Sequence, residues 1–505
     1  MFKKLTPVGR LTAIVLIVAA LGGGVWALLK NNPNIAESLG ADGKYDATII
    51  VDTYTGWAPI VWGNGGKEGT KDSYFSQKFG LRLKIIQMDD FEACRAALRN
   101  GEADMAFCTL DSYPVEMSAS GDMTDMKYFM IHNFSAGADA IVVTRNITTV
   151  ADLKGKKVAY SEGTASHSLL LNVLETSGLT GNDIELVKTG YGSDVAQAFK
   201  ARQVDAAVVF TPDDDDCVAA VPGAHILTST ASSNTIVTDG FIAKKDWIAK
   251  HEDIARKFTE AMLWANSEYT YNENSYNEAC KVFAEAFEID PEYVMSTGKK
   301  IKFATLADNV NWFGLNTAYT GTKGETLYTK MAHTYASLGL TKNPLPWTKV
   351  SYTGVVEYLM ENNNLTNNQE ENGTKQKKFT APTKAMETTA ALSNKKVVIN
   401  FATNSSTLDD NARCTIDNEF AGIAAQFSNM RVRVEGNCDA VGNYEYNITL
   451  SKKRAQAVVD YLVKEYNMDP NRFITVGNGS KKAIADGVTG ASEAYRTTDF
   501  QLISE

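Results

Sequence analysis

The sequence predicts a two-lobed α/β protein followed by a smaller α+β domain. Three features of the 505-residue chain indicate this fold class. Strand-like and helix-like segments alternate from residue 46 to about residue 361, a polar stretch breaks the pattern at residues 362–395, and a second patterned region covers residues 396–505. At roughly 100–200 residues per domain, such a chain holds about three folding units.

The first thirty residues predict one transmembrane helix. Lys3, Lys4 and Arg10 precede an uncharged run at residues 11–29. As a helix, this run would extend about 28 Å, close to the thickness of a bilayer's hydrocarbon core. Basic residues before a span favour a cytoplasmic N-terminus, so we expect residues 1–30 to be a signal anchor with the rest of the chain outside the membrane. A cleaved signal peptide is the alternative, although the apolar run is longer than a typical signal core.

Residues 31–45 form a polar spacer, and residues 46–361 then predict two α/β units. Short apolar strands alternate with segments whose apolar residues recur at helical spacing, as Phe91, Cys94 and Leu98 do. This order is typical of a parallel sheet with helical crossovers. The expected strands are Ala47–Val51, Leu81–Met88, Asp104–Cys108, Ala140–Thr144, Lys157–Ser161, Ile184–Val187 and Asp205–Phe210. The expected helices are Asp72–Phe79, Asp90–Asn100, Val150–Leu153, Ser166–Ser177 and Asp194–Ala201, and after Phe241 the chain is mostly helical. We expect the chain to return to the first α/β unit after the second one, which implies a two-lobed protein with a cleft between the lobes.

Residues 362–395 predict a flexible linker. They are rich in Asn, Gln, Thr and Lys and poor in large apolar residues, so they cannot bury enough surface to fold alone. The ends of such a coil lie roughly 30–35 Å apart on average. The domain at 396–505 resumes regular patterning. Its expected elements are a strand at Val397–Phe401, a helix at Leu408–Phe427, a strand around Val432 and Val434, a helix that buries Val458, Val459, Leu462 and Tyr466, and strands at Phe473–Val476 and Asp499–Ile503.

Composition argues against several functions. With 50 basic and 60 acidic residues the formal charge is -10, which disfavours binding to nucleic acid. Six cysteines are too few for a disulfide scaffold, and none forms a Cys-x-x-Cys pair. The five histidines are scattered singly. No P-loop, Gly-x-Ser-x-Gly or dinucleotide motif occurs. We therefore expect no metal site, no cofactor and no enzymatic activity.

The C-terminal region contains the most specific motif. A half-buried strand runs into Asp439 and Gly442, and a helix with an Asn-x-x-Leu-Ser-x-x-Arg-Ala pattern follows. The matching helix residues are Asn447, Leu450, Ser451, Arg454 and Ala455. This region resembles the OmpA-like peptidoglycan-binding domain, with a βαβαβ-type α+β fold. The resemblance implies that Asp439 and Arg454 grip the diaminopimelate of the peptide stem, with Asn447 and Arg496 as further binding residues.

The match to the OmpA-like motif has departures. Cys438 replaces the usual Thr before Asp439, and the late Asn-Arg-Arg motif retains only Arg496. One alternative is that Asp439 and Arg454 merely pair with each other on the surface. A disulfide between Cys414 and Cys438 is a further option in an oxidising compartment.

The region from about residue 46 to residue 345 also resembles a known family. Three segments support the resemblance: Asp139–Ala159, Val204–Asp213 and Thr238–Trp247. They look like substrate-binding proteins of the nitrate/taurine/aliphatic-sulfonate group of ABC importers, a periplasmic-binding-protein fold whose two lobes close on a solute by hinge motion. The segment at 304–314 is similar to a subgroup in which such a receptor is fused to an OmpA-like domain.

The solute is expected where strand C-termini meet helix N-termini. Hydroxyls and free N–H groups at such places could hold an oxyanion. The candidate solute-binding residues are Thr55, Trp57, Thr109, Asp111, Thr164, Ser166 and Asp213. In the alternative interpretation, Thr164 and Ser166 are helix caps and Trp57 belongs to the core. The run at 213–216 is expected to be a solvated loop, and if it faces the ligand it favours a cationic or zwitterionic solute.

Three functions are weighed. The leading hypothesis is a single-pass inner-membrane protein whose bulk lies in the periplasm, where it captures a small solute and binds peptidoglycan; an ABC permease or another inner-membrane complex is the expected partner. The alternative is a wall-anchored scaffold protein whose two-lobed domain at residues 46–361 binds a protein partner. The third is an enzyme similar to yeast-type thiamine-pyrimidine synthases, which need a cysteine-rich iron site and a lysine–histidine pair. His167 stands alone, and no cysteine cluster occurs.

Overall fold

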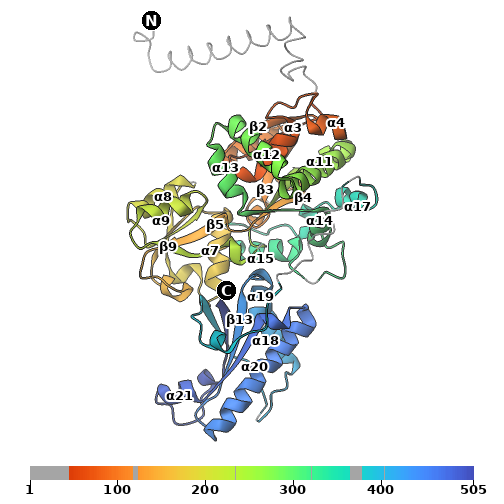
Figure 1. Cartoon of the computed structure of the whole chain (residues 1–505). Coiled ribbons are helices and arrows are strands. Elements are labelled where there is room, and N and C mark those ends of the chain that lie inside the picture. The colour runs from red at the N-terminus through yellow and green to blue at the C-terminus, as the bar shows by residue number, and fades with distance from the viewer. Residues whose placement is uncertain are drawn as a thin grey trace, which may run out of the picture. The chain divides into compact units, whose positions relative to one another are not determined.

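The computed structural model describes residues 45–117, 123–190, 192–233, 235–319, 321–363, 365, 378–402 and 404–504. The predicted anchor and nearly all of the spacer lie outside these residues. No helix in the described ranges has both the length and the apolarity needed to cross a membrane. The chain divides into two compact units, one formed by residues up to Ala106 with His251–Pro291 and the other by Phe107–Lys250 with Glu292–Glu505 (Figure 1).

The first unit contains the predicted parallel strands. β1 (Ala47–Val51) pairs in parallel with β2 (Leu83–Gln87) and β3 (Met105–Thr109), and the chain passes into the second unit within β3. Its helices are α3 (Ala58–Asn64), α4 (Tyr74–Phe79), α5 (Phe91–Asn100), α11 (Glu252–Tyr271) and α12 (Glu273–Phe287). The side chain of Asp90 caps α5 by accepting from the Ala93 N–H, which explains why the helix begins there. The predicted β-α-β-α-β order is confirmed, and the sequence missed only α3.

The second unit contains a five-stranded sheet in the order β7-β6-β8-β5-β9. The strands are β5 (Asp139–Val143), β6 (Lys157–Tyr160), β7 (Glu185–Lys188), β8 (Ala206–Phe210) and β9 (His225–Ser229). The helices are α7 (Ala165–Glu175), α8 (Ser193–Lys200) and α9 (Asp213–Ala220). Ile141 and Val143 pack into one apolar cluster, whereas Val142 packs into another with residues of α8 and α9. Since both faces are covered, β5 reads as a continuous apolar run.

The helix α9 corrects one expectation. The acidic run at 213–216 is the first turn of this helix rather than a solvated loop. Carboxylates are favoured at a helix N-terminus because the first N–H groups there are unpaired and the helix dipole is positive. Asp214 is fully buried.

The same unit holds three antiparallel strands in the order β11-β4-β10, which are part of a six-stranded sheet. These three strands are β4 (Met126–Ser135), β10 (Thr238–Lys244) and β11 (Ile301–Phe303). The remaining helices before the C-terminal domain are α6 (Tyr113–Glu116), α10 (Lys245–Lys250), α13 (Pro291–Gly298), α14 (Leu306–Trp312), α15 (Gly324–Ser337), α16 (Trp347–Val350) and α17 (Gly354–Glu361). Thr305 and Asp308 form a capping box at α14. The Asn309 amide on α14 bonds both the N–H and the carbonyl of Ile131, which fixes α14 to β4.

The C-terminal domain has the predicted α+β fold. Its sheet has the order β12-β15-β13-β14, and β13 is parallel to β14. The strands are β12 (Ser393–Val397), β13 (Arg431–Asn437), β14 (Phe473–Gly479) and β15 (Thr498–Ile503), and the helices are α18 (Asp410–Ile416), α19 (Gly422–Gln426), α20 (Tyr444–Tyr466) and α21 (Lys481–Ala485). The long helix α20 lies along β13 and β14 (Figure 1). A Cβ on Gly436 would lie 2.1 Å from the Ser451 carbonyl oxygen, so only glycine permits this close approach.

The C-terminal domain begins earlier than the sequence indicated. The described residues 378–395 of the predicted linker pack against it. Arg431 Nη1 donates to the Thr380 carbonyl at 3.0 Å, and Arg433 Nη1 donates to the Thr389 carbonyl at 2.8 Å. The strand expected at 397–401 is β12, displaced four residues towards the N-terminus. Composition could not place this boundary because the segment contributes mainly backbone carbonyls, which every sequence has.

We expect a fragment of residues 378–505 to be markedly more stable than one of residues 396–505. The shorter fragment lacks part of β12 and the carbonyls that Arg431 and Arg433 use, and it leaves these buried guanidinium groups without those partners. Each lost bond to a charged donor costs about 1.5–3 kcal/mol. Urea unfolding followed by circular dichroism measures the difference. Equal midpoints would show that the segment contributes no stability.

Candidate functional site

The loop after β13, the middle of α20 and the turn before β15 hold three of the predicted peptidoglycan residues: Asp439, Arg454 and Arg496. Asp439 Oδ2 lies 3.5 Å from Arg496 Nε and accepts a hydrogen bond from the Ser492 N–H at 3.3 Å. Arg454 Nε donates to the Ser405 carbonyl at 3.0 Å. Burial lowers the pKa of Arg454, and the charges of Arg496 and Asp439 both act on it. Asp439 is therefore paired with Arg496, and the alternative in which it only pairs with Arg454 is not what the structure shows.

Two other predicted features of this region have different positions. Asn447 is buried, and its Nδ2 donates to the Val441 carbonyl and to Ser480 Oγ, both at 2.8 Å. It holds the loop that follows β13. Cys414 is exposed, Cys438 is buried, and both are free, so the suggested disulfide does not form. Cys438 instead faces the carbonyl of Asn447 at 3.7 Å.

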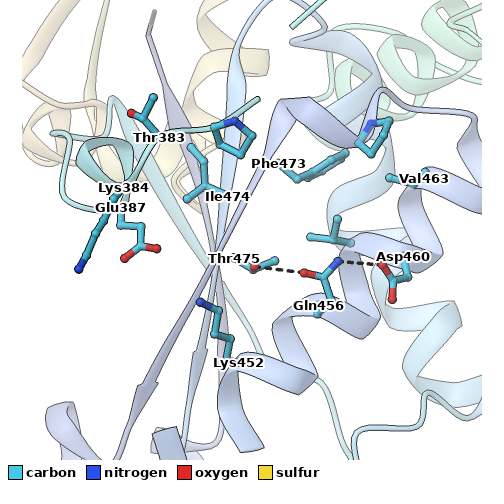
Figure 2. Close-up of a pocket in the computed structure, with 13 residues that line it drawn as sticks. Thr383, Lys384, Glu387, Lys452, Gln456, Asp460, Val463, Phe473, Ile474 and Thr475 are labelled. Atoms are coloured by element: carbon cyan, nitrogen blue, oxygen red, sulfur yellow. Dashed lines mark hydrogen bonds between the residues drawn. The ribbon is translucent and has the colours of Figure 1, made fainter. Parts of the chain in front are cut away.

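A groove of about 440 Å³ lies on another face of the same domain (Figure 2). It is lined by residues of α20, β14 and the segment at 382–387, and the lining does not include Asp439, Arg454 or Arg496. Across it, Thr475 Oγ1 donates to Gln456 Oε1 at 3.2 Å, and Gln456 Nε2 donates to Asp460 Oδ1 at 2.8 Å. These polar groups are already partnered with one another.

The first unit holds two of the predicted solute residues. Thr55 and Trp57 form a short helical turn after β1, and both are buried. Trp57 Nε1 donates to Asp52 Oδ1 at 2.6 Å. Burial raises the pKa of Asp52 to about 6, although the bond from Trp57 opposes this rise. Asp52 is not among the residues predicted from the sequence, although its position directly after an apolar strand is a signal that could have identified it.

The hydroxyls predicted at the start of α7 are used locally. Thr164 Oγ1 donates to the Ser161 carbonyl, and Ser166 Oγ donates to the Val208 carbonyl, both at 2.9 Å. Thr164 occupies the N-cap position of α7 without a side-chain capping bond, so capping is not its role. Asp213 lies in the first turn of α9, where burial raises its pKa.

Thr109 is the last residue of β3, and Asp111 follows the strand; both lie in the second unit. Thr109 is buried, and its carbonyl accepts from Ser112 Oγ at 3.1 Å. Asp111 is completely buried, and neither of its carboxylate oxygens has a hydrogen-bond partner. Burial raises the pKa of Asp111 to about 7, and the nearby Ser168 hydroxyl partly offsets the rise. Among the predicted solute residues, Asp111 has the pKa that is raised furthest from its ordinary value.

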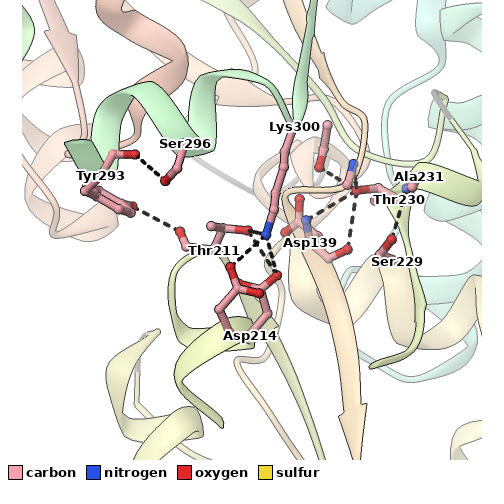
Figure 3. A network of polar contacts seen from close by, with 12 residues as sticks. Asp139, Thr211, Asp214, Ser229, Thr230, Ala231, Tyr293, Ser296 and Lys300 are labelled. Atoms are coloured by element: carbon pink, nitrogen blue, oxygen red, sulfur yellow. Dashed lines mark hydrogen bonds and ion pairs between the residues drawn. The ribbon is translucent and has the colours of Figure 1, made fainter. Parts of the chain in front are cut away.

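A polar network joins α9 to the residue before β11 (Figure 3). Lys300 Nζ lies 3.0 Å from Asp214 Oδ2, 3.1 Å from Asp215 Oδ2 and 3.1 Å from Thr211 Oγ1. Tyr293 donates to the Thr211 carbonyl at 3.1 Å. Lys300 is not among the residues predicted from the sequence, although a run of four aspartates is a signal that a cation is needed nearby. Within the described residues, no group of three or more His, Cys, Asp and Glu side chains is arranged to hold a metal ion.

The fold and these two sites define a two-part chain: an α/β domain of the binding-protein type and a small α+β domain with a clustered Asp–Arg site. Residues 69–273 match the family described as NMT1/THI5 like, and residues 400–497 match the OmpA family. The chain thus joins a region that matches the NMT1/THI5-like family to a C-terminal region that matches the OmpA family.

Curated relatives match each part separately. The putative aliphatic sulfonates-binding protein of Escherichia coli is 37% identical over 23% of this chain and 36% of its own length. The peptidoglycan-associated lipoprotein of Rhizobium meliloti is 36% identical over 17% of this chain and 47% of its own length. The chain spans less than two thirds of the length of the curated relatives it matches first. The relatives of the NMT1/THI5-like part are named as binding proteins, in agreement with the expectation of a non-catalytic protein.

A solved structure also overlaps the α/β domain. The periplasmic aliphatic sulphonate binding protein SsuA from Escherichia coli matches with a TM-score of 0.49 at 18% identity, and the match covers 62% of this chain and 98% of that chain.

Proposed function

We propose that this chain is a membrane-anchored, cell-wall-tethered periplasmic solute-binding protein. The observation that supports it most is the fusion itself, since one part resembles proteins named for sulfonate and taurine binding and the other a peptidoglycan-associated lipoprotein. The apolar run at 11–29 is the proposed anchor, and an ABC permease or another inner-membrane complex is the proposed partner. Cell fractionation followed by N-terminal sequencing tests the anchor, because a soluble form beginning near residues 22–30 would exclude it.

In the C-terminal domain, Asp439, Arg454 and Arg496 are proposed to hold the zwitterionic end of diaminopimelate. Asp439 is the acceptor for the ligand's ammonium, and Arg496 sits beside it as a partner that the ligand displaces or shares. The Arg454 guanidinium is held by backbone carbonyls and by the ring of Phe401, 4.9 Å away. Such an oriented fork binds a carboxylate through two parallel hydrogen bonds. Asn447 acts by shaping the loop.

In the α/β domain, Asp111 and Thr109 of the second unit are proposed to bind the solute, and Thr55 and Trp57 of the first unit are separate candidates. Thr164, Ser166 and Asp213 stay candidates, with the Thr164 and Ser166 hydroxyls already bonded to backbone carbonyls. Hinge closure is the general mechanism by which such domains enclose a ligand.

A small solute is expected to raise the melting temperature of the purified protein. A ligand at 100 times its dissociation constant stabilises the folded state by about 2.7 kcal/mol, which gives a clear shift. The measurement is a thermal-shift screen of oxyanions, sulfonates, phosphonates and amino acids with the full chain. Peptidoglycan fragments serve as the control, because they should affect only the transition of the C-terminal domain. The absence of any shift across the screen would favour the scaffold alternative.

A further inference from the structure

Asp111 is a buried acid without a counterion. Its loop is fixed by the Leu110 N–H, which donates to the Thr238 carbonyl at 2.8 Å. The side chain is 0% exposed, and both oxygens lack a partner in the described part of the chain. Charges removed from water are strongly unfavourable unless they are paired. The structure thus places the Asp111 carboxylate, a hydrogen-bond acceptor with two unpartnered oxygens, in the interior of the unit. It lies just after β3, whose C-terminal end is one of the positions where the solute is expected.

Two buried tyrosines, Tyr335 and Tyr128, lie close enough to Asp111 for its charge to act on them. Tyr335 donates to or accepts from Ser168 Oγ at 2.7 Å, and the charge of Asp111 contributes to the raised pKa of Tyr335, for which burial is the main cause. The His167 ring lies 5.5 Å from the Tyr335 ring. Tyr128, whose pKa is raised mainly by burial and also by Asp111, lies 5.9 Å from the ring of Tyr113, two residues after Asp111. Tyrosine faces attract cations through their ring quadrupole.

Among the residues that the structure describes, no basic side chain donates a hydrogen bond to Asp111. Burial lowers the pKa of His167 to about 4, so this imidazole is neutral at physiological pH. Asp139 on β5 adds a further negative field at Asp111, while Asp239 on β10 acts on the neighbouring Tyr128. Lys300, the cation of the adjacent network, is held by Asp214 and Asp215. An anionic group beside ionised Asp111 would be repelled.

We propose that the solute carries a cationic nitrogen and that Asp111 binds this nitrogen among the rings of Tyr113, Tyr128 and Tyr335. The inference rests on the proposed solute-binding function and specifies its substrate class: a primary or quaternary ammonium, in a zwitterion or a simple cation. The ammonium satisfies both open oxygens, and the ring faces add a cation–π contribution. Since domains of this type open and close by hinge motion, complete burial of the site is compatible with entry of the ligand.

The test compares ligands that differ only in the charged nitrogen. Isothermal titration calorimetry with the full chain uses 2-aminoethanesulfonate against ethanesulfonate, and choline against its neutral isostere 3,3-dimethyl-1-butanol. We expect at least one ammonium ligand to bind ten times or more tightly than its matched partner. D111N should weaken that ligand about 100-fold and change ethanesulfonate less than threefold. Asp125→Asn, the same charge change at an exposed position, should change neither.

A pH series supplies a second readout. The ligand requires ionised Asp111, whose pKa of about 7 without ligand lies above the ordinary value of 3.8. Protons therefore compete with the ligand below this pKa, and affinity should fall about 100-fold from pH 8 to pH 5. Asp139 acts on Asp111, and Cys108, Asp239, His167 and Tyr160 are further titratable groups that act on or contact its tyrosines. D111N, which should lose most of this pH dependence, identifies the group responsible.

The outcomes separate the inference from the function on which it rests. If ethanesulfonate or another anion binds and the ammonium ligands do not, the inference is overturned while the receptor function stands. If both members of each pair bind equally, Asp111 is a structural acid and the inference is again overturned. If no solute of the broad screen and none of these four ligands binds, both fail. Should D111N not fold, the matched pairs with the unaltered chain still decide.

Discussion

Replacing Asp439 or Arg454 with alanine is expected to abolish sedimentation of the protein with insoluble peptidoglycan sacculi. Asp439 is largely buried at the end of β13, and Arg454 is held in place by carbonyls of residues 402 and 405. Each substitution removes one member of a charge-assisted contact to the ligand, which typically costs about 2–5 kcal/mol. A loss of this size lowers the affinity by roughly 30- to 4,000-fold.

The measurement uses the fragment 378–505, whose folding is first checked by circular dichroism, and then the full chain. Arg454→Lys keeps the charge but loses the planar fork, so its affinity should be intermediate. Asp410→Ala and Arg413→Ala are matched controls, because these side chains form an exposed pair on α18 and should not alter sedimentation. If Asp439→Ala and Arg454→Ala both sediment like the parent, the proposed roles are wrong.

Replacing Lys300 with methionine is expected to destabilise the second unit by about 3 kcal/mol. Removing one partner of a buried ion pair costs about 3–5 kcal/mol because the other charge stays buried and unpaired. The Asp214 side chain is 1% exposed, whereas that of Lys300 is 29% exposed, so the lower end of the range applies. The melting temperature should fall by about 6–12 °C, at roughly 2–4 °C per kcal/mol.

Differential scanning calorimetry of the full chain measures this change. Asp214→Asn in the Lys300→Met background should recover most of the loss, since it removes the unpaired charge. Lys299→Met, a substitution of the exposed neighbouring lysine, is the control and should have little effect. Asp215→Asn should also cost little because that side chain is 67% exposed. A Lys300→Met protein that melts like the parent would mean that the ion pair between Lys300 and Asp214 contributes no stability.

Local patterns predicted most of the α/β fold. The strands β1, β3, β5 and β8 are short apolar runs buried on both faces, and α5 has its apolar residues on one side. The burial of each element can therefore be predicted from a few neighbouring residues. β4 and β10 were not predicted as strands. Their antiparallel pairing joins segments about 100 residues apart, and no local period reports such a pairing.

The residues of the candidate peptidoglycan site also fall into those that local sequence predicts and those that it does not. The motif around Asp439 and Arg454 could be read from spacing, because the loop after a strand and the first turns of the next helix lie together in any such unit. The partner of Asp439 could not, since Arg496 reaches it through the tertiary fold.

The sequence by itself determined the fold classes, the order of the two domains and the candidate residues at strand ends, because these depend on periodicity and short motifs. Only the tertiary structure decided that Asp214 is buried beside a lysine 86 residues away, that residues 378–395 belong to the C-terminal domain, and that Asp111 lies among tyrosines without a counterion. Burial and charge pairing depend on which distant segments meet. That is set by the packing of the whole unit and not by the few residues on either side of a motif.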